Sequence, residues 1–467
     1  MEKLQHVPRT RVRRSPRYEF VIGSIVALFW LFGISSLGRE ASISLFASDD
    51  IDAMKTCAIR NLEADLTFLD SAKPISKNEF LARRDKLAQA IAQSGADAFV
   101  VEPGPAFQYY ANVSGSAWGL SERPFLMIVR PDTSDDGKVT AKTAFLVPHF
   151  EQGRALLLPI PSSQKDLDII IWEESWSPYE TLHNSTFFED ISKPTVMIDE
   201  DMRDFIVRGL QSASFKTVGL APEVELIRQQ KSESEIEILR AVNTGTASAV
   251  RAMRPCLKPD LTEADVGDIL NAALESVGFK PAFALVLFDE HAANPHGGTA
   301  NPNKKLTRDT MVLIDVGAVY LGYESDCTRS FLIEQGKKKS SDPLRQEKHT
   351  VWQIVHEAQT VAAMTMKPNV TAAEVDLAAR TVIEHAGYGY AFTHRLGHSI
   401  GIRGHESPYL NMGNRDTYLK PGMVFTNEPG IYLEQRFGIR HEDVYVIREN
   451  GEAELLTGKR ATNMFEP

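Results

Sequence analysis

The sequence predicts an α/β domain followed by an α+β domain, with a separate segment in front of both. Its 467 residues are too many for one compact core. Helical and extended patterns alternate with short links up to about residue 220, and beyond it helical runs and strand hairpins occupy separate stretches. We therefore expect domains at residues 76–222 and 223–467.

The first domain begins with an amphipathic stretch. Apolar residues recur at helical spacing from Glu79 to Ser94, and Gly95 follows as a helix-capping residue. Three apolar runs then predict buried strands, at residues 96–101, 125–129 and 143–147. This alternation is typical of an α/β domain.

The second domain opens with a strongly helical stretch from Glu223 to Arg254. Within it, Ser232 and Glu235 have the spacing of a capping box. The later elements that we expect are a helix at 263–277, a strand hairpin at 311–333, helices at 345–366 and 371–386, and two strand-rich segments.

An apolar run near the N-terminus predicts a membrane segment. Six basic residues precede eighteen uncharged residues from Phe20 to Leu37, a length that can span a hydrocarbon core at about 1.5 Å per residue. The basic flank keeps the first residues cytoplasmic. We expect a basic tail (1–18), a signal-anchor (19–38) and a polar stem (39–75), with the catalytic part lumenal or extracellular.

Two other interpretations of this run stay open. A cleaved signal peptide would give a secreted protein, and an organelle presequence would direct the chain elsewhere. Three glycosylation sequons, at Asn112, Asn184 and Asn369, fit a lumenal location.

Charge and cysteine usage exclude several classes of protein. A net charge of -11 argues against a nucleic-acid surface, which needs clustered Lys and Arg. The cysteines are Cys57, Cys256 and Cys327, which is too few for a disulfide framework. No CxxC pair is present, so a thiolate zinc site is excluded, and one unassigned bridge is possible.

Two pairs of acidic residues lie in segments that can fold as hairpins. Asp315 and Asp326 are symmetric about a turn near Tyr320, which would place them opposite each other on one face. Glu428 and Glu442 flank a turn in the same manner, with Glu442 inside an apolar strand pattern. Buried carboxylates this close repel one another unless a cation lies between them. A solvated surface pair is the competing interpretation of the two aspartates.

Histidines supply the remaining donors. His394, His398 and His405 lie within twelve residues, among glycines that allow close backbone approach. Four carboxylates and one imidazole suit two divalent ions of manganese, cobalt, iron or zinc, with manganese first among them. Two such ions about 3.5–4 Å apart would share a hydroxide that attacks a polarised carbonyl.

The motifs and their order resemble a known family. IDVGA with SDCTRS, HRLGHSIG with GHE, TNEPGIY and GIRHEDV are similar to motifs of the pita-bread metallopeptidases: aminopeptidase P, prolidase and methionine aminopeptidase. The resemblance covers residues 225–460, and more weakly 75–220, which resembles the creatinase-like N-terminal domain. It implies a creatinase-like α/β domain and an α+β pita-bread catalytic domain.

The resemblance also implies roles for single residues. Asp315 would hold one ion, Asp326 and Glu442 both ions, and His398 and Glu428 the other. Glu428 would also move the proton of the attacking water. Three further residues would line the substrate pocket: His296, His405 and Arg440.

We expect a peptidase that cleaves Xaa-Pro bonds, either an aminopeptidase or a dipeptidase, and a homodimer. The alternatives are a metal-dependent lyase, a non-peptide amide hydrolase and a non-catalytic binding homologue on the same scaffold. The lyase type carries an extra acid near the first aspartate, where this chain has Val316 and Gly317. The metal-free relatives lack the ligands, and this chain keeps all five.

Overall fold

The computed structural model describes residues 50–298, 301–333 and 342–467. The predicted basic tail, the signal-anchor and the first part of the stem lie outside the described residues. No helix in the described part of the chain combines the length and the apolar character that crossing a membrane requires. Membrane attachment therefore stays a prediction.

The N-terminal part is built on one six-stranded sheet with the order β4-β3-β2-β1-β5-β6. Strands β1, β2 and β3 pair antiparallel, and the other neighbours are parallel. The strands are β1 (Ala98–Val101), β2 (Leu126–Thr133), β3 (Val139–Pro148), β4 (Ile169–Trp172), β5 (Thr195–Ile198) and β6 (Lys216–Val218). The helices are α2 (Lys77–Ser94), α3 (Pro105–Ala111), α4 (Gln152–Leu156), α5 (Pro178–His183) and α6 (Asp204–Ser212).

Local sequence signals explain helix α2. The Ser76 side chain accepts a hydrogen bond from the backbone N–H of Glu79, and Gly95 ends the helix at φ 75°. The predicted helix and the three predicted strands of this part are confirmed, with ends shifted by a few residues.

The C-terminal part contains five helices among its described residues: α7 (Pro222–Gln229), α8 (Glu233–Met253), α9 (Glu263–Ser276), α10 (Pro343–Thr365) and α11 (Ala372–His385). The stretch predicted from Glu223 to Arg254 is two helices, because Ser232 adopts an extended conformation between them. Ser232 and Glu235 form the predicted capping box at the start of α8.

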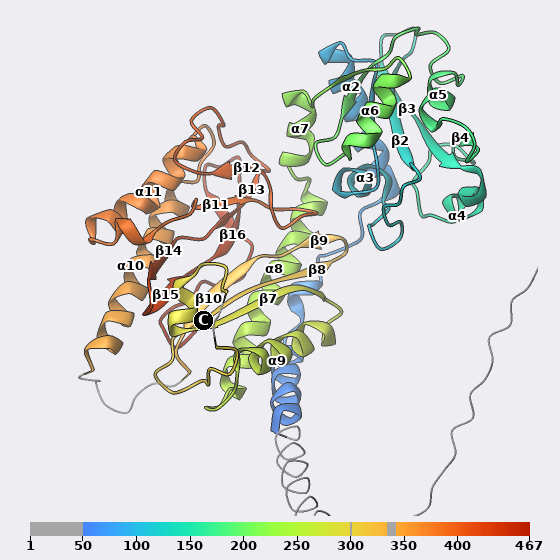
Figure 1. The fold of residues 1–467 in the computed structure, drawn as a ribbon. Coiled ribbons are helices and arrows are strands. Elements are labelled where there is room, and N and C mark those ends of the chain that lie inside the picture. Colours follow the sequence, from blue (N-terminus) through green and yellow to red (C-terminus); the bar gives the residue numbers. More distant parts are fainter. Residues whose placement is uncertain (1–49, 299–300, 334–341) are drawn as a thin grey trace, which may run out of the picture. The chain divides into compact units, whose positions relative to one another are not determined.

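Three sheets carry the strands of this part. Their orders are β10-β8-β7 with β9 beside β8, β12-β11-β13-β16-β17, and β14-β15. The strands are β7 (Lys280–Phe288), β8 (Val312–Tyr320), β9 (Tyr323–Glu324), β10 (Cys327–Phe331), β11 (Gly397–Ser399), β12 (Glu406–Leu410), β13 (Val424–Asn427), β14 (Gly430–Leu433), β15 (Phe437–Arg440), β16 (Asp443–Ile447) and β17 (Ala453–Leu455). Figure 1 shows these strands between α8 and α9 on one side and α10 and α11 on the other.

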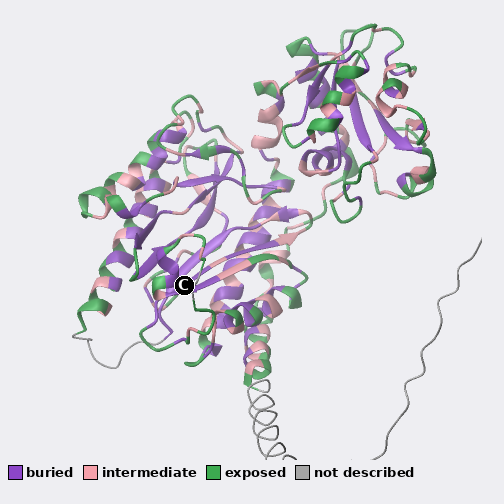
Figure 2. Ribbon diagram, in the orientation of Figure 1, coloured by how far each residue is buried: buried purple, intermediate pink, exposed green. Residues whose placement is uncertain are grey.

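The strands around the site are buried (Figure 2). One apolar cluster joins α10 and α11 to the strands from β12 to β16, and includes Val355, Val375, Phe425 and Ile439. This packing fixes the backbone of the chain segments that carry the predicted glutamate ligands.

The first predicted hairpin forms with a different register. Asp315 pairs with Thr328 rather than with Asp326, because the turn lies at Leu321 and Gly322, with φ of 48° and 86°. The predicted direct pairing of the two aspartates is therefore wrong by two positions along one strand. A two-residue offset keeps a side chain on the same face, so Asp326 still approaches Asp315.

The second predicted hairpin has the predicted register. Strands β14 and β15 pair Gly430 with Arg440, so Glu428 and Glu442 meet just beyond the paired ends. Glu442 does not lie inside a strand, as predicted, but in the break between β15 and β16.

A disulfide joins Cys57 to Cys256 across 199 residues of sequence. Residues 54–63 are helical, so the bridge ties the last part of the predicted stem to the end of α8. The third cysteine, Cys327, is a buried free thiol.

The predicted boundary between residues 222 and 223 stays a prediction, because residues 54–467 form one compact unit. Contacts between the two parts include the Arg83 guanidinium, which donates to the Tyr323 hydroxyl at 3.1 Å.

Reduction of the disulfide should lower thermal stability. A bridge that closes a long loop restricts the unfolded chain and typically contributes about 2–4 kcal/mol. We expect dithiothreitol to lower the melting temperature of the wild-type protein and to leave that of a Cys57→Ser/Cys256→Ser double variant unchanged. An equal melting temperature of the wild type with and without reductant would contradict the bridge.

Candidate metal centre

Five predicted ligands come together from three distant stretches of the chain. Asp315 lies on β8 and Asp326 between β9 and β10, while His398 lies on β11. Glu428 lies between β13 and β14, and Glu442 between β15 and β16. The chain thus converges on one place mainly through breaks between strands.

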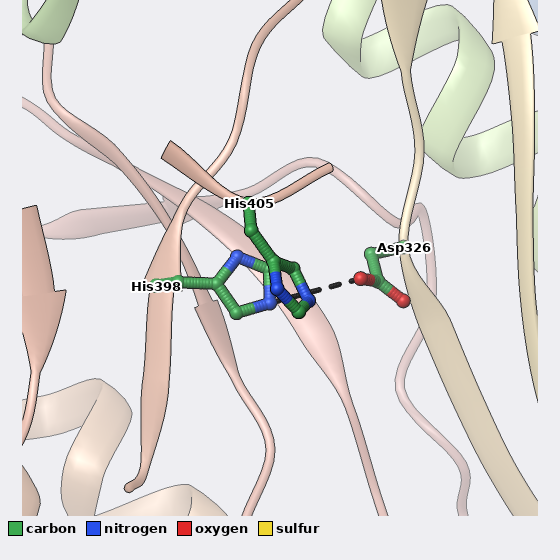
Figure 3. A group of neighbouring side chains, drawn as sticks. All are labelled: Asp326, His398 and His405. Atoms are coloured by element: carbon green, nitrogen blue, oxygen red, sulfur yellow. Dashed lines mark ion pairs between the residues drawn. The ribbon is translucent and has the colours of Figure 1, made fainter. Parts of the chain in front are cut away.

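Donor atoms of these residues form overlapping groups. One atom each from Asp315, Asp326 and Glu442 lie within 4.8 Å of one another, as do atoms of His398, Glu428 and Glu442. A third group consists of Asp326, His398 and His405 (Figure 3). Glu442 and Asp326 each belong to two groups, which is the arrangement that two neighbouring cations need.

The orientation of His398 points to a missing cation. Its Nδ1 donates to the backbone carbonyl of Ser399 at 3.1 Å, and burial lowers its pKa to about 3. The unprotonated Nε2 therefore faces Glu428 Oε1 at 3.3 Å and Asp326 Oδ2 at 3.7 Å. Three acceptors facing one another without a proton are repulsive, and a metal ion between them would remove the repulsion.

The carboxylates are in an equally unfavourable state. Burial, followed by repulsion from the neighbouring carboxylates, raises the pKa of Asp326 and of Glu442 well above the usual range. Burial raises the pKa of Glu428 to about 7. Asp315 Oδ1 is buried and lacks a hydrogen-bond partner among the described residues. These residues fit a pair of divalent cations by charge, by donor type and by their unsatisfied oxygen.

Arg440 offsets part of the negative charge. Its guanidinium lies 2.6 Å from Asp315 Oδ2 and donates to Thr328 Oγ1, to the Pro295 carbonyl and to the Tyr432 hydroxyl. Thr328 in turn donates to Glu442 Oε2 at 2.7 Å. Arg440 therefore pairs with a carboxylate, as its position predicted, but with one of this chain.

His405 lies beside His398, with ring centroids 4.0 Å apart, and is exposed (Figure 3). Its loop is anchored on both sides. The Gly404 N–H donates to Glu324, and Glu406 forms ion pairs with Lys231 at 2.9 Å and Arg228 at 2.8 Å. Burial, and then the charge of Arg395, lowers the pKa of His405, so its imidazole is neutral at pH 7.

The structure separates His296 from the donor groups. It is exposed, and its charge contributes to the lowered pKa values of His394 and His405, which indicates that it lies near them. His441 also stays outside the donor groups, because its buried ring packs edge-on against Trp352 at 4.6 Å.

Sequence reasoning missed a chain of polar contacts beside the cluster. His394 Nε2 lies 2.8 Å from the Tyr432 hydroxyl, which also accepts from Arg440. The spacing of the HRLGH motif gives no signal for the tyrosine, which lies 38 residues away.

A cleft of about 430 Å³ opens onto this site. Its lining includes Asp326, His405 and Tyr409, together with Phe283, Glu324, Arg403 and Gly404. The cleft gives a small molecule a route to the donor groups.

Comparisons with known proteins agree with this geometry. Residues 237–449 match the model of metallopeptidase family M24. An uncharacterised peptidase of Schizosaccharomyces pombe is 39% identical over 429 residues, 91% of this chain and 91% of its own. An Xaa-Pro dipeptidase of Pyrococcus furiosus is 36% identical over 236 residues, 50% of this chain and 65% of its own.

Solved structures extend the similarity to most of the chain. Dipeptidase PepE from Mycobacterium ulcerans has a TM-score of 0.70 at 27% identity, covering 83% of this chain and 98% of its own. An X-Pro aminopeptidase from Thermotoga maritima has a TM-score of 0.64 at 27% identity, with coverages of 82% and 99%. These matches span both the N-terminal sheet and the strands that hold the cluster.

The stability of the metal-free protein should fall as pH rises from about 5 to about 7. Glu428 titrates near 7 in the fold but near 4.3 in an unfolded chain. The folded state therefore binds more protons in this window and loses stability as they dissociate. Denaturant unfolding at several pH values measures the slope.

The slope should be shallower for Glu428→Gln and unchanged for Glu434→Gln, an exposed glutamate of the adjoining hairpin. Added divalent metal should suppress the slope in the wild type. A metal-free stability that is constant or rises over this window would contradict the buried carboxylate cluster.

Proposed function

Because the chain belongs to the metallopeptidase family M24, we propose that it hydrolyses Xaa-Pro peptide bonds with the help of two divalent metal ions. The family makes the chain a metal-dependent hydrolase, with the pita-bread fold predicted from its motifs. The proposal adds the substrate class, the number of ions and the roles of single residues.

The observation that carries the proposal is the sharing of carboxylates between donor groups. Asp315, Asp326 and Glu442 would hold one ion, and His398 and Glu428 would complete the ligands of the second with Asp326 and Glu442. Oxygen donors with a single imidazole favour manganese, with cobalt, zinc or iron as the other candidates. When bound, two such ions polarise a carbonyl and lower the pKa of water.

Glu428 is the proposed carrier of the proton. Its raised pKa allows the carboxylate to take a proton from water and to return it at neutral pH. It would deliver this proton to the proline nitrogen as the peptide bond breaks. His405 would donate a hydrogen bond to the substrate carbonyl, since its neutral ring is exposed to the cleft. His296 and Arg440 are the remaining proposed contacts of the substrate pocket.

Two findings support proline at the scissile bond. The relatives from Pyrococcus furiosus and Thermotoga maritima are named as Xaa-Pro enzymes. An Xaa-Pro bond is a tertiary amide without an N–H, so a dry pocket need not supply an acceptor.

The proposed location is the lumen of an oxidising compartment or the cell exterior. The Cys57–Cys256 disulfide supports it, because such bonds persist in oxidising environments. Anchoring through residues 19–38 and the homodimer stay predictions.

Replacement of Glu428 tests the proposal. Metal-free protein would be reloaded with manganese, cobalt, zinc or iron and assayed for release of proline from Ala-Pro and from Ala-Pro-Ala. We expect metal-dependent cleavage, and a loss in kcat of about 10²–10⁴ in Glu428→Gln, because the proton carrier is removed.

The matched control is Glu434→Gln, which removes the same charge from an exposed site of the same hairpin and should keep the wild-type rate. Absence of cleavage with every metal, in protein that binds two ions, would refute the peptidase. Equal rates in the two variants would refute the role of Glu428.

A further inference from the structure

Arg395 is a cation without a counter-ion beside the metal centre. It lies three residues before His398 and is half-buried. No described residue accepts a hydrogen bond from its guanidinium or pairs with it, and its Nε is buried without a partner. The guanidinium instead lies over the Tyr409 ring, 4.8 Å from the centroid.

The neighbouring arginines differ in this respect. Arg440 is held by Asp315 and by three oxygen acceptors. Arg380 pairs with Asp376 at 2.9 Å, and Arg403 pairs with Asp201 at 2.6 Å. Of these four arginines in the described part of the chain, Arg395 alone keeps its donors uncommitted.

Two observations place Arg395 at the cleft. Tyr409, which supports the guanidinium, lines the cleft together with Asp326 and His405. The charge of Arg395 also contributes to lowering the pKa values of Glu428, His398 and His405. Coulomb interactions weaken with distance, so the guanidinium lies within reach of all three residues.

We propose that Arg395 binds the C-terminal carboxylate of the substrate and thereby selects dipeptides over longer peptides. A guanidinium presents its N–H groups as a planar fork that matches a carboxylate. In an Xaa-Pro dipeptide, the carboxylate follows the scissile bond by one residue. In a tripeptide, an uncharged amide occupies that place. The inference rests on the proposed function and names the group that makes the enzyme a dipeptidase.

The experiment compares kcat/KM for Ala-Pro, Ala-Pro-amide and Ala-Pro-Ala in the metal-loaded enzyme. The wild type should prefer Ala-Pro over the amide roughly tenfold to hundredfold, the range for a hydrogen bond to a charged group. Arg395→Gln should lose this preference, mainly through a higher KM for Ala-Pro, with little change for the amide. Arg395→Lys should restore part of it.

Arg403→Gln is the matched control, because it removes the same charge from the lining of the same cleft. Loss of the preference in both variants would show a long-range charge effect and overturn direct binding by Arg395. An equal loss for Ala-Pro and its amide in Arg395→Gln would also overturn it, as would a wild type that prefers Ala-Pro-Ala.

A second pair of peptides separates this inference from the proposed function. Ala-Ala and Ala-Ala-amide carry the same carboxylate contrast without proline. Cleavage of Ala-Ala alone would refute proline specificity, while the ratio to its amide would still test Arg395. If no peptide is cleaved, calorimetric binding of Ala-Pro and its amide to the wild type and Arg395→Gln decides the matter. Equal affinities in the wild type would overturn the inference.

Discussion

The structure depends on four carboxylates held in one buried cluster against their mutual repulsion. Asp315, Asp326, Glu428 and Glu442 approach within ion-binding distance, and Arg440 compensates for one of the four charges. Such a cluster is costly without cations, because burial and like charge both disfavour ionisation. The surrounding fold can hold this arrangement because the strands that carry it are packed between helices.

A second set of buried contacts fixes the backbone beside the ligands. Arg329 is fully buried, and its guanidinium donates to the Glu442 carbonyl at 2.6 Å and to Asp443 Oδ1 at 2.6 Å. Gln359 of α10 donates to the Asn427 carbonyl and to Asp443. These contacts tie both glutamate-bearing breaks to one helix, so the position of the ligands depends on packing well outside the site.

The sequence predicted the fold and the residues that converge, because hairpin symmetry and motif order are local signals. It placed Glu428 opposite Glu442 correctly. The register at Asp315 was wrong, because Leu321 adopts a positive φ that its residue type does not suggest. The Cys57–Cys256 bridge could not be assigned, since the partners are 199 residues apart. The free guanidinium of Arg395 and the committed one of Arg440 differ only in tertiary contacts.

The most direct test of a two-ion centre is the metal content of the protein. Inductively coupled plasma mass spectrometry of protein reloaded with manganese and freed of excess ion should give two ions per chain for the wild type. Asp326→Asn and Glu442→Gln should each lower this number, because both carboxylates are shared between donor groups. One ion or none in the wild type, or two ions in both variants, would contradict a centre built on shared carboxylates.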